Sequence, residues 1–167
     1  MSCLGVLFSL DNETVTKIAS HKTNEERLEY LQEQIEEVYF DQHPEWVAEL
    51  DKSWDALHRC LTDGNLEWDN GLYPLNHVVL GGKRLYQGQD YIITLKTPEQ
   101  VNDISKAIEL VTKEGLRSSY FKIDEKKYDM ELSEDDFEYT WDWFFQTSNF
   151  WKLAAEQNRN VLFTVDQ

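Results

Sequence analysis

The chain has 167 residues, a length at which one hydrophobic core is usual and a second independent domain is not expected. Hydrophobic residues make up 41% of it, and with only 7 Gly and 3 Pro the composition excludes a disordered chain. The 32 acidic residues against 16 basic ones give a formal net charge of −16, which disfavours nucleic acid and anionic membrane surfaces as partners, because both are bound through Lys and Arg.

The same charge favours a basic protein partner, since a negative field speeds the encounter, although excess acid also serves solubility alone. The two cysteines, Cys3 and Cys60, are too few for the disulfide framework of a small secreted domain. The first residues lack the basic region of a signal peptide, and no stretch has the length of a transmembrane helix. We therefore expect a cytoplasmic protein.

Residues 4–10 alternate between apolar and small or polar side chains, which predicts a first strand. Asp11 is expected to cap a short helix over residues 12–20, and Thr23 to begin a longer helix over residues 24–39. The outer side of the longer helix carries negative charges without basic partners: Glu29, Glu33, Glu36 and Glu37.

Pro44 ends that unit, and a short helical segment is expected before Asp51. Asp51 is then the expected N-cap of a helix that stops near Gly64. One face of this helix places a histidine within an apolar stripe: Trp54, Leu57, His58 and Leu61. The residues up to 90 are rich in turn signals, with a short buried strand expected at residues 78–80.

Residues 91–95 predict a strand, and the Thr-Pro-Glu-Gln run at 97–100 is typical of a helix start. This helix is expected to keep its amphipathic face until Gly115 closes it. Residues 116–132 fit no single element.

Ser133 is expected to cap a third major helix, with Glu134 and Asp135 in the first turn, where negative charge interacts favourably with the helix dipole. Ser148 is expected to cap a last helix, and residues 161–165 alternate as a closing strand. These elements predict an α+β fold: a single compact domain over the whole chain, with several amphipathic helices packed on a small sheet that includes the N- and C-terminal strands.

A set of residues along the chain resembles the YfbM-like family of bacterial proteins, a domain of unknown function. The resemblance lies in Asp51-Lys52, Trp54, Leu57-His58, Leu61-Thr62, Gly64, Pro74-Leu75, Leu80-Gly81, Thr97-Pro98-Glu99 and Val101. The chain departs from the pattern by Asp63, and residues 117–130 match poorly. The resemblance covers essentially the whole chain and implies a single α+β domain, residues 1–167, of the bacterial cytoplasm, without an established activity, cofactor or catalytic residue.

His58 has two interpretations. It is a core histidine whose ring is hydrogen-bonded inside the protein, or it opens to a cleft and acts as a general acid or base. In the second case a pocket would gather the side chains of Trp54, Asp55, His58, Glu67, Asp69 and His77. No catalytic residue follows from the spacing alone.

The histidines and cysteines show no metal-binding spacing, so neither a metal nor a cofactor is expected. Cys60 is expected to be a buried, unreactive thiol, because nothing in its sequence environment lowers its pKa. Metal and cysteine chemistry therefore suggest no reaction.

The aromatic residues between 137 and 151 exceed what a helix face needs for packing, and any exposed remainder would resemble a binding surface. The residues expected to contact a partner are Glu29, Glu33, Glu36, Glu37, Glu134, Asp135, Trp143 and Trp151. Our leading hypothesis is an acidic interaction protein that blocks a basic toxin or enzyme domain, as an immunity protein does. The alternatives are a small hydrolase or transferase that uses His58 with nearby acids, and a domain without a partner.

Overall fold

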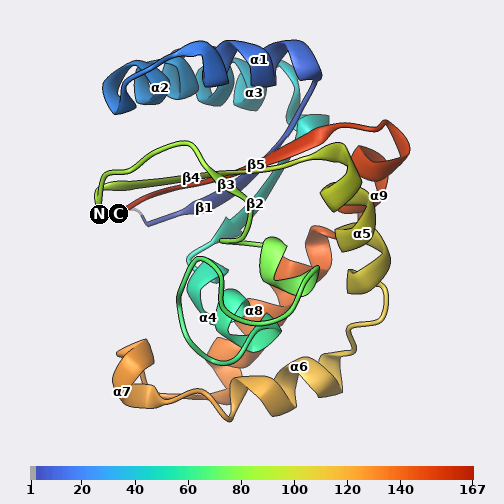
Figure 1. The fold of residues 1–167 in the computed structure, drawn as a ribbon. Helices are drawn as coiled ribbons and strands as arrows, with labels where there is room; N and C mark the ends of the chain where they lie inside the picture. The colour runs from blue at the N-terminus through green and yellow to red at the C-terminus, as the bar shows by residue number, and fades with distance from the viewer. Residues whose placement is uncertain (1–2) are drawn as a thin grey trace.

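A computed structural model describes residues 3–167 and shows a five-stranded antiparallel sheet with helices on both faces (Figure 1). The strand order is β2-β1-β5-β4-β3. The strands are β1 (Gly5–Leu10), β2 (Val47–Asp51), β3 (Lys83–Arg84), β4 (Tyr91–Lys96) and β5 (Asn160–Asp166). The first and last strands pair at the centre of the sheet, which confirms the predicted α+β class.

One helical layer covers one face of the sheet and comes from the N-terminal quarter of the chain (Figure 1). It consists of α1 (Asn12–Ser20), α2 (Asn24–Tyr30), the π-helix η1 (Leu31–Glu36) and α3 (Glu37–Gln42). Its core contains Phe8 and Ile93 from the sheet with Ile18 and Ile35 from the helices. The 3-10 turn η2 (Pro44–Trp46) leads from this layer to β2.

The second layer, on the opposite face, holds the larger core (Figure 1). Its elements are α4 (Trp54–Leu61), the 3-10 turn η3 (Leu75–His77), α5 (Pro98–Ile108), α6 (Lys113–Tyr120), α7 (Glu125–Tyr128), α8 (Glu134–Gln146) and α9 (Ser148–Glu156). Because both faces of the sheet are covered, every residue of β4 is buried whichever way its side chain points. No helix among residues 3–167 combines the length and the apolar character needed to cross a bilayer.

Four helix starts lie where the sequence predicts them, because each has a side-chain cap. Asp11 accepts from Thr14 N at 2.8 Å and Thr23 accepts from Glu26 N at 3.2 Å. The start of α5 is a full capping box between Thr97 and Gln100. Ser133 in the same way accepts a backbone N–H of the first turn of α8.

The segment before α4 was predicted only in part. The short helical segment expected after His43 exists as η2, with Pro44 in its first turn, but it ends at Trp46. Residues 47–51, up to the predicted cap Asp51, form the edge strand β2 because they pair with β1. Asp51 has a left-handed backbone (φ 51°) that turns the chain out of this strand, so Ser53 is the N-cap position of α4. The strand was missed because its five residues are too few to show a clear periodicity.

Two further predictions were wrong. Residues 78–80 lie in a turn after η3, and the strand beside β4 is instead the two-residue β3. The helix that starts at Pro98 ends at Ile108, well before Gly115. Thr112 caps a separate helix, α6, by accepting from Gly115 N at 3.0 Å, so this glycine lies inside a helix.

Candidate functional site

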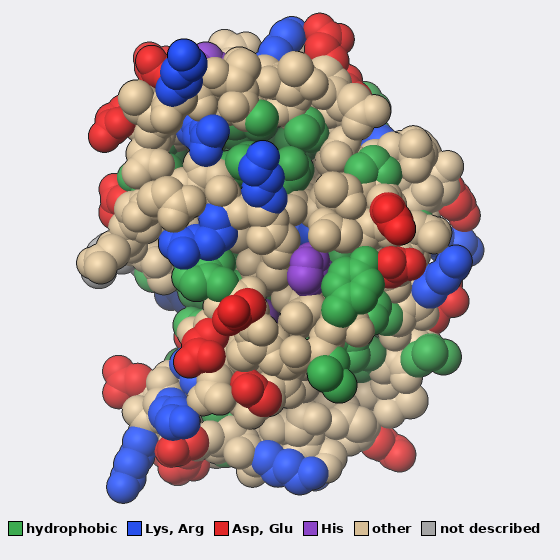
Figure 2. Space-filling view, in the orientation of Figure 1, with side chains coloured by type: hydrophobic (Ala, Val, Ile, Leu, Met, Phe, Trp, Pro, Cys, Tyr) green, Lys and Arg blue, Asp and Glu red, His purple; other side chains and the backbone are tan. Residues whose placement is uncertain are grey.

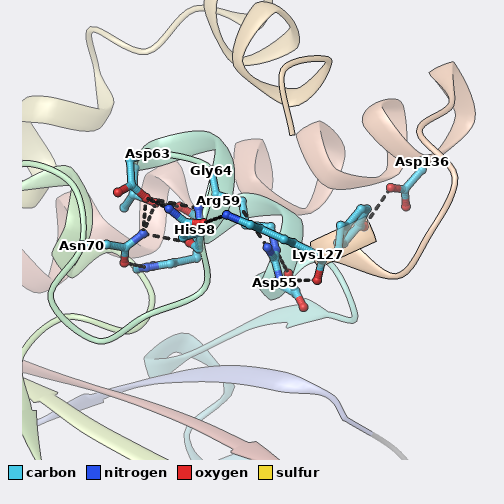
Figure 3. A network of polar contacts seen from close by, with 11 residues as sticks. Asp55, His58, Arg59, Asp63, Gly64, Asn70, Lys127 and Asp136 are labelled. Atoms are coloured by element: carbon cyan, nitrogen blue, oxygen red, sulfur yellow. Dashed lines mark hydrogen bonds and ion pairs between the residues drawn. The ribbon is translucent and has the colours of Figure 1, made fainter. Parts of the chain in front are cut away.

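His58 lies on α4 with its side chain fully buried and hydrogen-bonded to the loop that follows the helix (Figure 3). Its Nε2 is 2.8 Å from Asn70 Oδ1. The Asn70 amide nitrogen donates to Thr62 Oγ1, Asp63 Oδ1 and Asn65 O, so its oxygen is the acceptor and His58 Nε2 is the donor. The hydrogen bond of His58 therefore links this loop to α4.

Burial lowers the pKa of His58 and keeps its ring neutral, while the hydrogen bond to Asn70 acts in the opposite direction. Of the other residues predicted to share a pocket with His58, Glu67 and Asp69 have exposed side chains. His77 is half-buried, with its Nδ1 2.8 Å from Asn76 Oδ1. Within residues 3–167 none of these three side chains is hydrogen-bonded to His58, so its position does not support an acid–base role.

The remaining two predicted pocket residues stabilise the fold. Trp54 is 5% exposed, and its Nε1 donates to Cys3 O at 2.9 Å. Asp55 forms an ion pair with Arg59, whose Nε lies 2.6 Å from Asp55 Oδ1 (Figure 3). Arg59 also donates to Gly64 O and to Lys127 O, so one buried guanidinium joins α4 to the loop that follows it and to α7.

The same layer buries a thiol and two tyrosines. Burial raises the pKa of the Cys60 thiol to about 12, which agrees with the predicted unreactive cysteine. Tyr120 and Tyr128 both donate to Asp136 Oδ2, at 2.7 and 2.8 Å, and so link α6 and α7 to α8. These contacts extend the polar network of α4 through the layer.

Lys96 at the end of β4 is fully buried and was missed by the sequence analysis. Its Nζ donates to Val79 O at 2.5 Å and to Thr94 Oγ1 at 2.8 Å, and lies 5.3 Å from the centre of the Phe163 ring. Burial holds its pKa well below the ordinary range. Because side chains alternate along a strand, Lys96 lies on the same face of β4 as the core residue Ile92. This alternation is the sequence signal that could have predicted a buried lysine.

The acidic face predicted for residues 24–39 exists, with one correction. Glu29, Glu33 and Glu37 are exposed. Glu36 is not part of this open face: it is half-buried above the sheet and accepts a hydrogen bond from Tyr91 Oη at 2.6 Å, and burial raises its pKa. The prediction failed because the partner of Glu36 is 55 residues away in sequence.

A pocket of about 290 Å³ lies beside α2 and the π-helix η1. It is lined by His21, Glu26, Glu29, Tyr30, Glu33 and Gln34. The lining contains three glutamates and neither Lys nor Arg. The rings of His21 and Tyr30 are 5.3 Å apart. The π-turn is a wider turn than an α-turn, and such turns occur often at functional sites.

Charge is not uniform over the molecule. On the face seen in Figure 2, Lys and Arg side chains gather in the upper half, while Asp and Glu side chains lie both along the outline and across the lower half. The lining of a pocket is therefore a better guide to its partner than the net charge of the chain.

Of the two tryptophans predicted to contact a partner, one is buried in the core and the other lines a groove at the surface. Trp151 was predicted wrongly: its side chain is fully buried in the core under α9. Trp143 is half-buried and lines a groove of about 340 Å³ beside β2. Of the two acids at the start of α8, Glu134 pairs with Arg117, and Asp135 is exposed.

Within residues 3–167, no group of three or more His, Cys, Asp and Glu side chains has the arrangement of a metal site. The polar centre around α4 is closed, whereas the pocket at α2 and the groove at β2 are open to solvent. Fold and surfaces together describe a small acidic α+β domain whose candidate sites are the open pocket at α2 and the open groove at β2.

A comparison with family models identifies the family of this domain. The chain belongs to the family described as a domain of unknown function, DUF1877, whose model matches residues 1–164. A crystal structure of a protein of unknown function, YfbM from Escherichia coli, has the same fold, with a TM-score of 0.64 and 17% sequence identity over 97% of this chain and 99% of that one. The resemblance to YfbM-like proteins is thereby confirmed. No curated protein matches the chain.

Proposed function

We propose that the chain is a cytoplasmic interaction module that binds a basic protein partner through the acidic face of α2, η1 and α3, as an immunity protein binds a toxin domain. The observation that carries this proposal is the pocket lined by Glu26, Glu29 and Glu33 together with Tyr30. The face contains no catalytic constellation, so blocking a partner suits it better than a reaction.

The chemistry of the pocket suits a Lys or Arg side chain. Carboxylates accept charge-assisted hydrogen bonds from both, and the face of a tyrosine ring attracts a cation. Glu29 and Glu33 are exposed and stand four residues apart, a like-charge spacing that costs about 0.2–0.5 kcal/mol in a helix. A cation from a partner would remove this repulsion.

The −16 charge adds long-range attraction to a basic partner, and such steering raises association rates more than it raises affinity. Phosphate-bearing partners are repelled by the same field. Both arguments select a basic protein over nucleic acid or membrane.

The test is capture of partners from a bacterial lysate on the immobilised chain and on the double variant Glu29→Lys/Glu33→Lys. A control variant, Glu109→Lys/Glu131→Lys, changes the net charge equally at exposed positions away from the pocket. We expect one basic protein to be retained by the wild type and the control and lost by the double variant. Equal retention by all three would refute the role of this face.

A further inference from the structure

The two edges of the sheet are unlike each other. The edge strand β3 has two residues, Lys83 and Arg84, and so offers little backbone for pairing. The opposite edge strand, β2, has five residues and pairs with β1 along one side. Within residues 3–167 no strand pairs with its other side.

The open part of β2 runs from the carbonyl of Val47 to Glu49, because the Val47 N–H already donates to Pro44 O. Leu50 is excluded because its carbonyl accepts from Ser53 N at 3.0 Å and from Ser53 Oγ at 2.6 Å. An edge strand with free backbone groups is a template for another strand, and proteins use it to bind extended peptides.

A groove of about 340 Å³ runs beside this open segment. On one side it is lined by Val47, Ala48 and Glu49, and on the other by the end of α8 and the start of α9. Trp143 lies in that second wall, half-buried and in edge contact with the Tyr139 ring at 6.4 Å. A rigid tryptophan beside a strand edge supplies the aromatic anchor typical of interfaces.

The charge of the groove identifies its occupant. Glu45 and Glu49 are the charged residues of the lining, which contains neither Lys nor Arg. A second copy of this chain is a poor occupant, since each copy carries a net charge of −16. A basic segment satisfies the charge, and an extended one satisfies the strand edge.

We propose that an extended basic segment of the partner pairs with Val47–Glu49 as a sixth strand of the sheet. Ala48 packs toward the larger core and the groove, whereas Val47 packs toward the core on the other face. Since side chains alternate along a strand, the segment places an apolar residue opposite Ala48 and beside Trp143, and a Lys or Arg opposite Glu49. The segment therefore alternates basic and apolar residues.

This inference rests on the proposed function because it assumes a basic partner, but it concerns a surface remote in sequence from the pocket at α2. The probe is a synthetic peptide of alternating Lys and Val, and the measurements are its affinity and the backbone amide shifts of the full-length chain by NMR. Three comparison peptides are a scrambled one, one with Glu in place of Lys, and one in which alternate backbone nitrogens are methylated to prevent strand pairing.

With the wild-type chain we expect binding of the Lys–Val peptide, shifts centred on Val47–Glu49, and loss of binding on backbone methylation or on replacement of Lys by Glu. Glu49→Lys and Trp143→Ala should each weaken binding at least about tenfold, the loss expected for a charge pair or an aromatic anchor. Equal binding of the methylated and unmodified peptides, or shifts elsewhere, would overturn strand addition. The comparison of methylated and unmodified peptides uses only the wild-type chain, so it stays decisive even if a variant fails to fold.

The two proposals fail separately. Glu29→Lys/Glu33→Lys should bind the peptide like the wild type, because the pocket at α2 is not used. If the natural partner depends on that pocket but the peptide does not bind at β2, strand addition alone is wrong. If the peptide binds at β2 but the partner ignores Glu29 and Glu33, the role of the acidic pocket is wrong.

Discussion

The α4 network and the acidic pocket at α2 use polar residues in opposite ways. Around α4, His58 and Arg59 are buried and joined to neighbouring loops through Asn70 and Gly64. At the pocket, three glutamates share a lining that contains neither Lys nor Arg. Residues that resemble a site in the sequence can thus stabilise a core, while an open pocket can be lined by residues that match no catalytic or metal-binding motif.

The largest effect is expected from the buried region. Trp54→Ala should destabilise the fold by about 3–5 kcal/mol, because the side chain is 5% exposed and its removal leaves a cavity and an unpaired Cys3 carbonyl. Denaturant unfolding followed by circular dichroism measures this. An unchanged midpoint would mean that Trp54 is not a core residue.

The next largest effect is expected from Lys96, in how the unfolding free energy depends on pH. Burial lowers the pKa of Lys96 in the folded state below the unfolded value of about 10.4, so the unfolded state binds the proton first as the pH falls, and stability rises with pH. Relative to Lys96→Met, the unfolding free energy of the wild type should fall by up to about 1.4 kcal/mol per pH unit as the pH is lowered from about 10.4 toward the folded-state pKa. Parallel curves for the two proteins would show that Lys96 is charged inside the fold.

His58 should give a smaller effect of the same sign, at lower pH. Its pKa is lowered in the fold from the ordinary 6.5, so the unfolded state takes up the proton first as the pH falls below that value. The unfolding free energy of the wild type should therefore fall from about pH 6.5 downward, until the folded-state pKa is reached, and fall less in His58→Gln. His77, whose pKa is also lowered, is common to both proteins. A wild type that loses no more stability than the variant would contradict this account of His58.

The sequence predicted those parts of the fold that depend on neighbours along the chain. Asp11, Thr23, Thr97 and Ser133 each cap a helix because the bonded backbone N–H lies only three residues ahead. The edge strand β2 was missed because its identity depends on pairing with β1, about forty residues away. Long-range pairing leaves little trace in a short segment.

The candidate sites also depend on contacts between residues far apart in the sequence, which a short segment does not reveal. Trp143 and Trp151 belong to one aromatic stretch, yet the first lines a groove and the second is fully buried. Glu36 and Glu37 are adjacent, yet only Glu36 reaches Tyr91. Composition predicted that acidic and aromatic residues form a surface, but which of them are exposed depends on how distant elements pack.

The smallest effect on stability is expected at the acidic face. Glu29→Lys/Glu33→Lys replaces one like-charge pair by another, so the unfolding free energy should change by less than about 0.5 kcal/mol. Thermal unfolding against the Glu109→Lys/Glu131→Lys control measures it. A loss of several kcal/mol would mean that these glutamates stabilise α2 and η1 and would contradict their assignment to an exposed binding surface.

The most direct test of the account is the association rate of the captured partner with the wild type and with Glu29→Lys/Glu33→Lys, measured at low and high salt. If the acidic face attracts and holds a basic protein, the double variant should associate at least about tenfold more slowly at low salt. The difference should shrink toward 1 M salt, where the screening length is about 3 Å. Equal rates for both proteins at low salt would show that this face is only a solvated surface and would contradict the proposed function.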